Sequence, residues 1–415
     1  MRLRSNDMAN SFRSVIPAVE SYLFEPQRLA ACAVAFVIAY AVVAAVWLGD
    51  GFQPVDFTAF WGASWLTLHD TPTAIFDVQR MAYAHTIAIP NSTDVYHWLY
   101  PPTYLLIILP LAFLPYALSF GAWTVSTFAA YAWALSKIAA PRWVFMGLLA
   151  FPGTLMNVLT GQNGLFLASL FTAASCTLER RPIVAGVFIG LMSVKPQIGV
   201  LWPVALICGR HWLALAAAAA TTAFLALAAL IGFGPEPWLA FAHSVAAVQQ
   251  GFDGGLVSWI KIPTLYGGGR LLGLDRDSAY LIQFVVAAGV AITVGVIWSR
   301  QVPITLRASV LAIATLLVLP RLLVYDLALL ALPLTLLTVD GIKRGWRSYE
   351  RPLLVLAWLT PLLGLVVALA TGIHVTPLIL IALLLIAVRR SLAASTSDGD
   401  TRPPVLPHKT CSDQP

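Results

Sequence analysis

Apolar runs of near membrane-spanning length recur along almost the whole chain. A spanning α-helix needs roughly 20 predominantly apolar residues, because no water inside a bilayer satisfies the backbone polar groups. The runs therefore predict an all-α, polytopic integral membrane protein with about 10–13 transmembrane helices. They cover residues 28–48, 103–117, 118–138, 143–159, 163–178, 182–208, 211–233, 278–299, 303–320, 322–340, 352–371 and 373–388.

Few charged residues interrupt these runs, which limits the chemistry open to the chain. Hydrophobic residues make up 59% of the 415 residues and charged residues 11%. The formal charge of +6 comes from basic residues scattered between apolar runs, as is typical of cytoplasmic membrane anchors, so we expect no nucleic-acid partner. The four cysteines form no CxxC pair and show no metal-ligand spacing. We therefore expect no disulfide framework, no metal site and no other cofactor.

The distribution of charge predicts the domain organisation. Residues 1–27 carry several arginines and precede the first apolar run, which predicts a cytoplasmic N-terminal segment. The membrane-embedded domain is expected to span 28–390, with the basic stretch 341–351 on the cytoplasmic side. Residues 391–415 are rich in Ser, Thr, Asp and Pro, which predicts a disordered cytoplasmic tail.

The segment 49–100 is predicted to be the first external loop. Its charged residues are five aspartates and one arginine, and this acidic balance after a helix with a cytoplasmic start places the loop outside. Residues 56–68 carry aromatic side chains at helical spacing, so we expect a short helix along the membrane surface with its tryptophans at headgroup level. The polar insertion 232–261 predicts a second surface element.

Asp56 stands at the expected outer membrane face, directly after the first helix. A carboxylate at a partly dehydrated interface can act as a general base toward a sugar hydroxyl. The same residue, placed before a helical run, can instead cap that helix by accepting from free amide donors. The two roles are compatible.

Three charged residues lie inside apolar sequence: Lys195, Arg321 and Asp326. Charges within a membrane are costly, so such residues are hypotheses for function. Pro196 breaks the long run around Lys195, and broken membrane helices usually line a cavity. Lys195 could meet a lipid phosphate there, reach the nearer interface, or pair with Asp326.

Polar or proline-bearing breaks at the run boundaries supply further hydrogen-bonding groups. Gln162 and Asn163 can bind sugar hydroxyls, although Gly161-Gln162-Asn163-Gly164 also fits an ordinary turn between two helices. The other breaks contain Tyr100, Gln197 and Tyr325. Asp275-Arg276-Asp277 has the spacing of a metal-binding Asp-any-Asp motif, but we expect it to cap the helix that begins near Ser278.

Taken together, these breaks resemble glycosyltransferase family 87, the polyprenyl-phosphate-mannose-dependent mannosyltransferases of the membrane-embedded GT-C class. The matching pieces follow family order along positions 56–326. They are Asp56-Phe57 with Phe60-Trp61 and Ala63, Ile75-Phe76-Asp77, Tyr100-Pro101-Pro102 with Pro110-Leu111 and Leu114-Pro115, Gly161-Gln162-Asn163, Lys195-Pro196-Gln197, and Pro320 through Asp326.

The resemblance implies a GT-C-type fold that transfers mannose, with inversion, from a polyprenyl-phosphate carrier to a lipid or glycan acceptor. It implies a bacterial inner-membrane protein whose active site faces the periplasm. Asp56 matches the catalytic base, and Lys195, together with Arg321, is expected to contact the carrier phosphate. Relatives often have histidine or another polar residue at the position of Arg321. The sugar or acceptor is expected at Tyr100, Gln162, Asn163, Gln197, Tyr325 and Asp326.

A second hypothesis from the residues themselves is a transporter or flippase of lipid-linked sugar. The broken helix at Lys195 and the buried charges Arg321 and Asp326 motivate it, because transporters bind their substrates at such interruptions. A transferase forms a new glycosidic bond, whereas a transporter moves its substrate unchanged.

Overall fold

A computed structural model describes residues 25–49, 55–90, 96–253 and 258–397. These residues form helices and no strands, which confirms the all-α fold. The α-helices are α2 (Pro26–Gly49), α3 (Thr58–His69), α4 (Val78–Ala88), α5 (Leu105–Ile108), α6 (Tyr116–Ser136), α7 (Arg142–Leu149), α8 (Pro152–Thr160), α9 (Gly164–Thr177), α10 (Pro182–Leu191), α11 (Pro196–Gly199), α12 (Trp202–Cys208), α13 (Trp212–Phe233), α14 (Glu236–Asp253), α15 (Leu265–Leu271), α16 (Arg276–Trp298), α17 (Ile304–Val318), α18 (Ala331–Arg344), α19 (Glu350–Thr371) and α20 (Thr376–Ser397).

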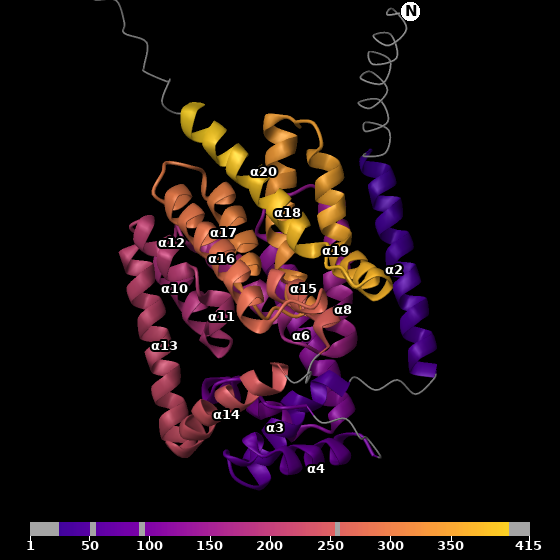
Figure 1. Cartoon of the computed structure of the whole chain (residues 1–415), viewed down its shortest axis with the longest axis vertical. Helices are drawn as coiled ribbons and strands as arrows, with labels where there is room; N and C mark the ends of the chain where they lie inside the picture. The colour runs from indigo at the N-terminus through magenta and orange to yellow at the C-terminus, as the bar shows by residue number, and fades with distance from the viewer. Residues whose placement is uncertain (1–24, 50–54, 91–95, 254–257, 398–415) are drawn as a thin grey trace, which may run out of the picture.

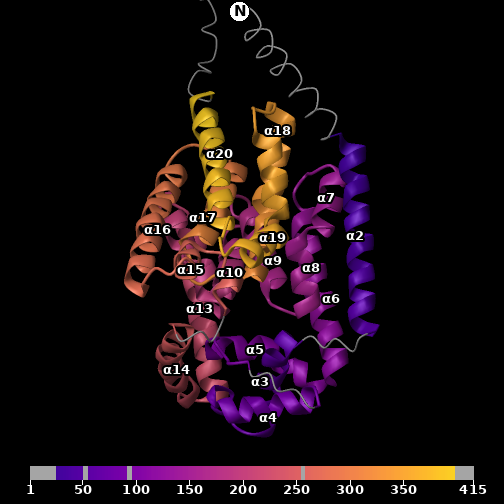
Figure 2. The ribbon, with the colours of Figure 1, turned by 45° about the vertical axis from the view of Figure 1, so that its right-hand side comes forward.

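The long helices run side by side, and shorter ones gather at one end of the bundle. Figure 1 shows α3, α4 and α14 grouped at the end away from the start of α2. Figure 2 shows the same grouping after a 45° turn, with α2 at the edge of the bundle. The helix predicted over 56–68 is therefore present as α3, and the polar insertion 232–261 contains α14.

Several predicted spans are shorter than a membrane because proline and glycine interrupt them. Among the described helices, five are long and apolar enough to cross a bilayer, or six if the bent pair α7 and α8 is one span. Shorter apolar helices cover most of the other runs, so the protein is polytopic. The run 182–208 is divided at Pro196 into α10, a 3₁₀ turn η5 (Met192–Val194), α11 and α12, as its proline predicts.

Burial separates central helices from those at the rim. Most of α9 and α17 is buried, whereas α13 and α16 expose large apolar side chains such as Phe224, Ile231, Phe284 and Ile292. Exposure of so much apolar surface to water would be unfavourable, whereas lipid chains solvate it. The exposed apolar side chains of these outer helices therefore support the assignment as a membrane protein.

The basic residues near the C-terminus do more than anchor the protein to the membrane surface. Arg390 is buried, and its Nη1 donates to Asp340 Oδ2 of α18 at 2.6 Å while its Nη2 binds Glu350 of α19. Arg389 Nη2 also donates to Glu350 Oε1, at 2.8 Å. This ionic cluster ties α18, α19 and α20 together. α20 continues to Ser397, past the start of the predicted tail at residue 391, and residues 398–415 lie outside the described residues, as do residues 1–24.

Two glycines one turn apart allow α10 to lie directly against α13. A Cβ at Gly186 would lie 2.4 Å from the carbonyl oxygen of Ala214, and one at Gly190 would lie 2.5 Å from Thr221 Cβ. Small residues at such spacing let membrane helices approach closely.

We expect Gly186→Ala to lower the melting temperature of the detergent-purified protein, because the added methyl group forces the two helices apart at a cost of about 1–3 kcal/mol. Gly289→Ala is the matched control, since a Cβ at Gly289 of α16 meets no atom within 4 Å. Equal melting temperatures for the two variants, measured by intrinsic fluorescence, would contradict this account of the contact.

Candidate active site

Asp56 lies in a one-turn 3₁₀ helix, η1 (Val55–Phe57), immediately before α3. The N-cap residue of α3 is Phe57, whose side chain makes no cap hydrogen bond, and Asp56 precedes it within η1. In the same loop, Asp77 caps α4 and accepts from Gln79 N at 2.8 Å. Asp56 itself is half-buried.

Aromatic rings hold the segment around Asp56 against the rest of the bundle. The buried ring of Phe57 lies 5.6 Å from Tyr116 and 5.5 Å from Phe120, measured between ring centroids. Phe60 is also fully buried and lies 5.6 Å from Tyr100. Edge-to-face contacts of this kind add to the free energy of burial. They connect the first loop to the breaks that contain the other predicted site residues.

The turn 161–164 lies between the Asp56 segment and the segment that carries Asp326. Gly161 has a φ of +69°, and a Cβ there would lie 2.8 Å from Phe57 Cβ. A Cβ at Gly164 would lie 2.4 Å from the carbonyl oxygen of Tyr325. Glycine is needed at both positions, at the first for the left-handed conformation and at both for the close approach. The predicted turn is therefore confirmed, and it forms a contact between η1 and the 3₁₀ helix η7 (Val324–Leu330).

Lys195, at the break before Pro196, and Asp326, in η7, form a buried ion pair. Lys195 Nζ lies 2.5 Å from Asp326 Oδ1, and only 5% of Lys195 and 4% of Asp326 is exposed. Lys195 Nζ also lies 3.5 Å from Asn163 Oδ1 and 5.0 Å from the centroid of the Tyr325 ring. Asp326 Oδ2 accepts from Leu323 N at 3.3 Å. Of the alternatives for Lys195, the internal pair with Asp326 is confirmed.

A cavity of about 250 Å³ opens beside this ion pair; we call it the polar cavity because charged and hydrogen-bonding side chains lie in its lining. It brings together most of the residues that the sequence singled out: Tyr100, Lys195, Gln197, Arg321, Tyr325 and Asp326. The side chains of Lys195, Arg321 and Asp326 together contribute one net positive charge to its lining. The cavity therefore suits a ligand that carries both hydroxyl groups and one negative charge.

Other lining residues were not predicted from the sequence. Phe241, Ser244 and Val245 of α14 and Ile262 line the polar cavity on one side, with Leu99 and Leu323. The sequence indicated a surface element in this region but gave no signal that it would cover the site. A hydrogen bond joins the segment after Ile262 to the segment that carries Arg321: Thr264 Oγ1 donates to the carbonyl oxygen of Pro320 at 2.8 Å.

Three predicted site residues lie outside the lining of the polar cavity. Asn163 is fully buried and contacts Lys195, and Gln162 is 8% exposed in the same turn. Asp56 is close enough to influence Tyr100 by its charge. Burial and the negative charge of Asp326 raise the pKa of Tyr100, hydrogen bonds with Asn163 and Tyr325 oppose this, and the charge of Asp56 adds to the increase. The Tyr100 hydroxyl therefore stays protonated and can donate a hydrogen bond.

Among the described residues, no group of three or more His, Cys, Asp or Glu side chains is placed to hold a metal ion. The Asp-any-Asp spacing at 275–277 has a different use: Asp275 Oδ2 accepts from Ser278 N at 3.1 Å and caps α16, as expected. Hydrogen bonds from Ser278 lower the pKa of Asp275.

We expect Asp326→Asn to destabilise the protein strongly, because it leaves the Lys195 ammonium buried without its anion, a loss of about 3–5 kcal/mol. Asp70→Asn is the control: it removes the ion pair between Asp70 and Arg80, whose side chains are 31% and 52% exposed. Exposed pairs contribute little to stability. A drop in melting temperature no larger for Asp326→Asn than for Asp70→Asn would refute the assigned role of the buried pair.

The model of glycosyltransferase family 87 matches residues 98–320, more than half of the chain. The matched stretch contains Tyr100, the turn 161–164 and Lys195, and it ends just before Arg321. No curated protein and no solved structure matches the chain.

Proposed function

Because this chain belongs to glycosyltransferase family 87, we propose that it transfers mannose from a polyprenyl-phosphate carrier to a lipid or glycan acceptor, with inversion at the anomeric carbon. Its family and its apolar helices make it a membrane glycosyltransferase. The sugar, the carrier, the inversion and the residue roles belong to the proposal, as does a bacterial inner-membrane location with the N-terminus in the cytoplasm and the site facing the periplasm.

The charge of the polar cavity is the observation that carries the proposal. A polyprenyl-phosphate sugar is a phosphodiester with one negative charge, and the lining contributes one net positive charge through Lys195, Arg321 and Asp326. When the glycosidic bond breaks, the departing phosphate gains further negative charge. Cations fixed beside it stabilise that charge in the transition state, so no strong general acid is needed.

Lys195 would meet the donor phosphate while remaining near Asp326. The ion pair holds the ammonium group at one place in a buried site, and Asn163 and the Tyr325 ring support it on other sides. Such a fixed cation loses little conformational freedom when the donor binds. In the proposed complex the phosphate shares Lys195 with Asp326, and Arg321 provides the second cation.

The proposed base is Asp56, which would accept the proton of the attacking acceptor hydroxyl. The aromatic contacts of Phe57 and Phe60 place its segment against the elements that line the cavity. Tyr100, Gln197 and Tyr325 supply hydrogen-bonding groups for the sugar or the acceptor inside the cavity. Gln162 and Asn163 would supply further hydrogen-bonding groups from the turn 161–164, outside the cavity lining.

Asp56→Asn is expected to lower the transfer rate by a factor of about 10²–10⁴, because the amide cannot take up the proton. The melting temperature of the variant is measured alongside, which separates a loss of catalysis from a loss of folding. Asp77→Asn, in the same loop, makes the same chemical change at an aspartate that caps α4 and should leave the rate close to that of the unchanged protein, because asparagine also caps helices. Transfer at the normal rate by Asp56→Asn would exclude the assigned role.

The donor class is tested with the purified full-length protein in liposomes, using membrane extract as the acceptor source. We expect label to pass from radiolabelled mannosyl-phosphoryl-polyprenol into a new glycosidic product, and none to pass from GDP-mannose. Transfer from GDP-mannose alone would overturn the donor assignment. Movement of the labelled lipid across the bilayer without a new product would instead support the transporter hypothesis.

Lys195→Gln is expected to reduce transfer by about 10²-fold, because one cation is lost beside the leaving phosphate. The double variant Lys195→Gln with Asp326→Asn leaves no unpaired charge, so it separates loss of catalysis from loss of folding. Lys261→Gln is the control for charge, since Lys261 is exposed and lies outside the cavity lining. A stable double variant with normal activity would refute the role of Lys195.

A further inference from the structure

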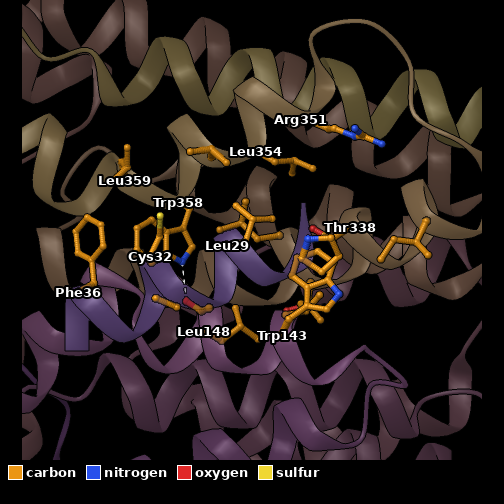
Figure 3. A pocket seen from close by; sticks show the side chains of 18 of the residues that line it. Leu29, Cys32, Phe36, Trp143, Leu148, Thr338, Arg351, Leu354, Trp358 and Leu359 are labelled. Carbon is orange, nitrogen blue, oxygen red and sulfur yellow. Dashed lines mark hydrogen bonds between the residues drawn. The ribbon is translucent and has the colours of Figure 1, made fainter. Parts of the chain in front are cut away.

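A second, larger cavity lies between α2, α7, α18 and α19. We call it the apolar cavity; its volume is about 480 Å³, and it is lined by Pro26, Leu29, Cys32, Ala33, Phe36, Trp143, Val144, Gly147, Leu148, Leu334, Thr335, Thr338, Ile342, Trp346, Arg351, Leu354, Val355, Trp358 and Leu359. Among the described residues that line it, Arg351 is the only charged one. Figure 3 shows Arg351 on one side of the cavity, with Phe36 and Leu359 on the other.

The apolar cavity is elongated along the helix axes. Its lining on α2 runs from Pro26 to Phe36, a length of about 15 Å at 1.5 Å per residue. At the end away from Arg351, the Phe36 and Trp358 rings pack edge to face at 5.1 Å, and Trp358 Nε1 donates to the carbonyl oxygen of Gly147 at 2.7 Å. An extended hydrocarbon chain matches this shape, because such chains lie parallel to membrane helices.

The end of the cavity at Arg351 is positively charged. There α2, α7 and α19 begin and α18 ends, so three helix N-termini add partial positive charge and one C-terminus adds partial negative charge. The nearby acids are already paired: Asp340 and Glu350 bind Arg344, Arg389 and Arg390. Among the residues that the structure describes, Arg351 forms no ion pair, and its guanidinium lies 5.2 Å from the Trp346 ring centroid.

An apolar slot with an arginine and tryptophans at one end fits an amphipathic ligand with an anionic head. We propose that the apolar cavity binds an anionic phospholipid of the surrounding bilayer, with an acyl chain along α2 and the phosphate at Arg351. Basic pockets between membrane helices bind such headgroups, and tryptophan favours the interface. The guanidinium donates two parallel hydrogen bonds to phosphate oxygens.

The donor of the proposed reaction would not be productive at this site. Arg351 follows the C-terminal end of α18, whereas Asp326 lies in η7, directly before its N-terminal end. The 14-residue α18 alone separates these ends by about 21 Å. A phosphate at Arg351 is therefore out of reach of Lys195, which makes the apolar cavity a lipid site separate from the polar cavity.

The proposal is tested by native mass spectrometry of the delipidated full-length protein, titrated with phosphatidylglycerol or with phosphatidylcholine of the same acyl chains. We expect phosphatidylglycerol to bind about tenfold more tightly, because its net charge is not cancelled by a choline group. Arg351→Gln should lower its affinity to that of phosphatidylcholine.

Arg347→Gln is the matched control, because it removes one exposed cation just before α19 that does not line the apolar cavity. It should keep the preference for phosphatidylglycerol. Thr338→Phe fills the cavity from α18 and should weaken both lipids without touching Arg351, so it tests the site even if Arg351→Gln is unstable.

Three outcomes would overturn the proposal. The first is equal binding of the two phospholipids by the unchanged protein. The second is an equal loss of preference in Arg351→Gln and Arg347→Gln, which would indicate a general effect of surface charge. The third is tighter binding of undecaprenyl phosphate than of phosphatidylglycerol, abolished by Arg351→Gln, which would assign the cavity to the carrier lipid.

Discussion

The buried ion pair between Lys195 and Asp326 is the constraint on which the site depends. A single charge within a membrane protein is costly, but two opposite charges in contact are tolerated when further polar groups surround them. Asn163, the Tyr325 ring and the amide of Leu323 provide those groups. The pair therefore requires two distant breaks in the helices to meet, and the polar cavity forms beside their meeting point.

Two glycines in a neighbouring turn also help to bring the segments of the site together. Gly161 and Gly164 allow the turn between α8 and α9 to contact both Phe57 and the backbone of Tyr325. As a result, the segment that carries Asp56 and the segment that carries Asp326 share one turn as a neighbour. Any larger side chain at these two positions would push one of the segments away and alter the distance between the proposed base and the proposed phosphate site.

Charges at the opposite end of the bundle serve a different purpose. Asp340 and Glu350 pair with Arg344, Arg389 and Arg390, and these ion pairs connect the last three helices. Arg351 lies next to this ionic cluster without joining it and lines the apolar cavity instead. Two groups of buried charges thus lie in the protein, one beside the polar cavity and one where several helices begin or end.

The sequence by itself determined the all-α membrane fold, the interruption at Pro196 and half of the residues that line the polar cavity. These follow from local properties: apolar length, proline geometry and the cost of buried charge. Only the tertiary structure decided that Lys195 pairs with Asp326, that α14 covers the cavity, and that α20 continues to Ser397. Contacts between distant segments depend on how whole helices pack, and no local pattern encodes that.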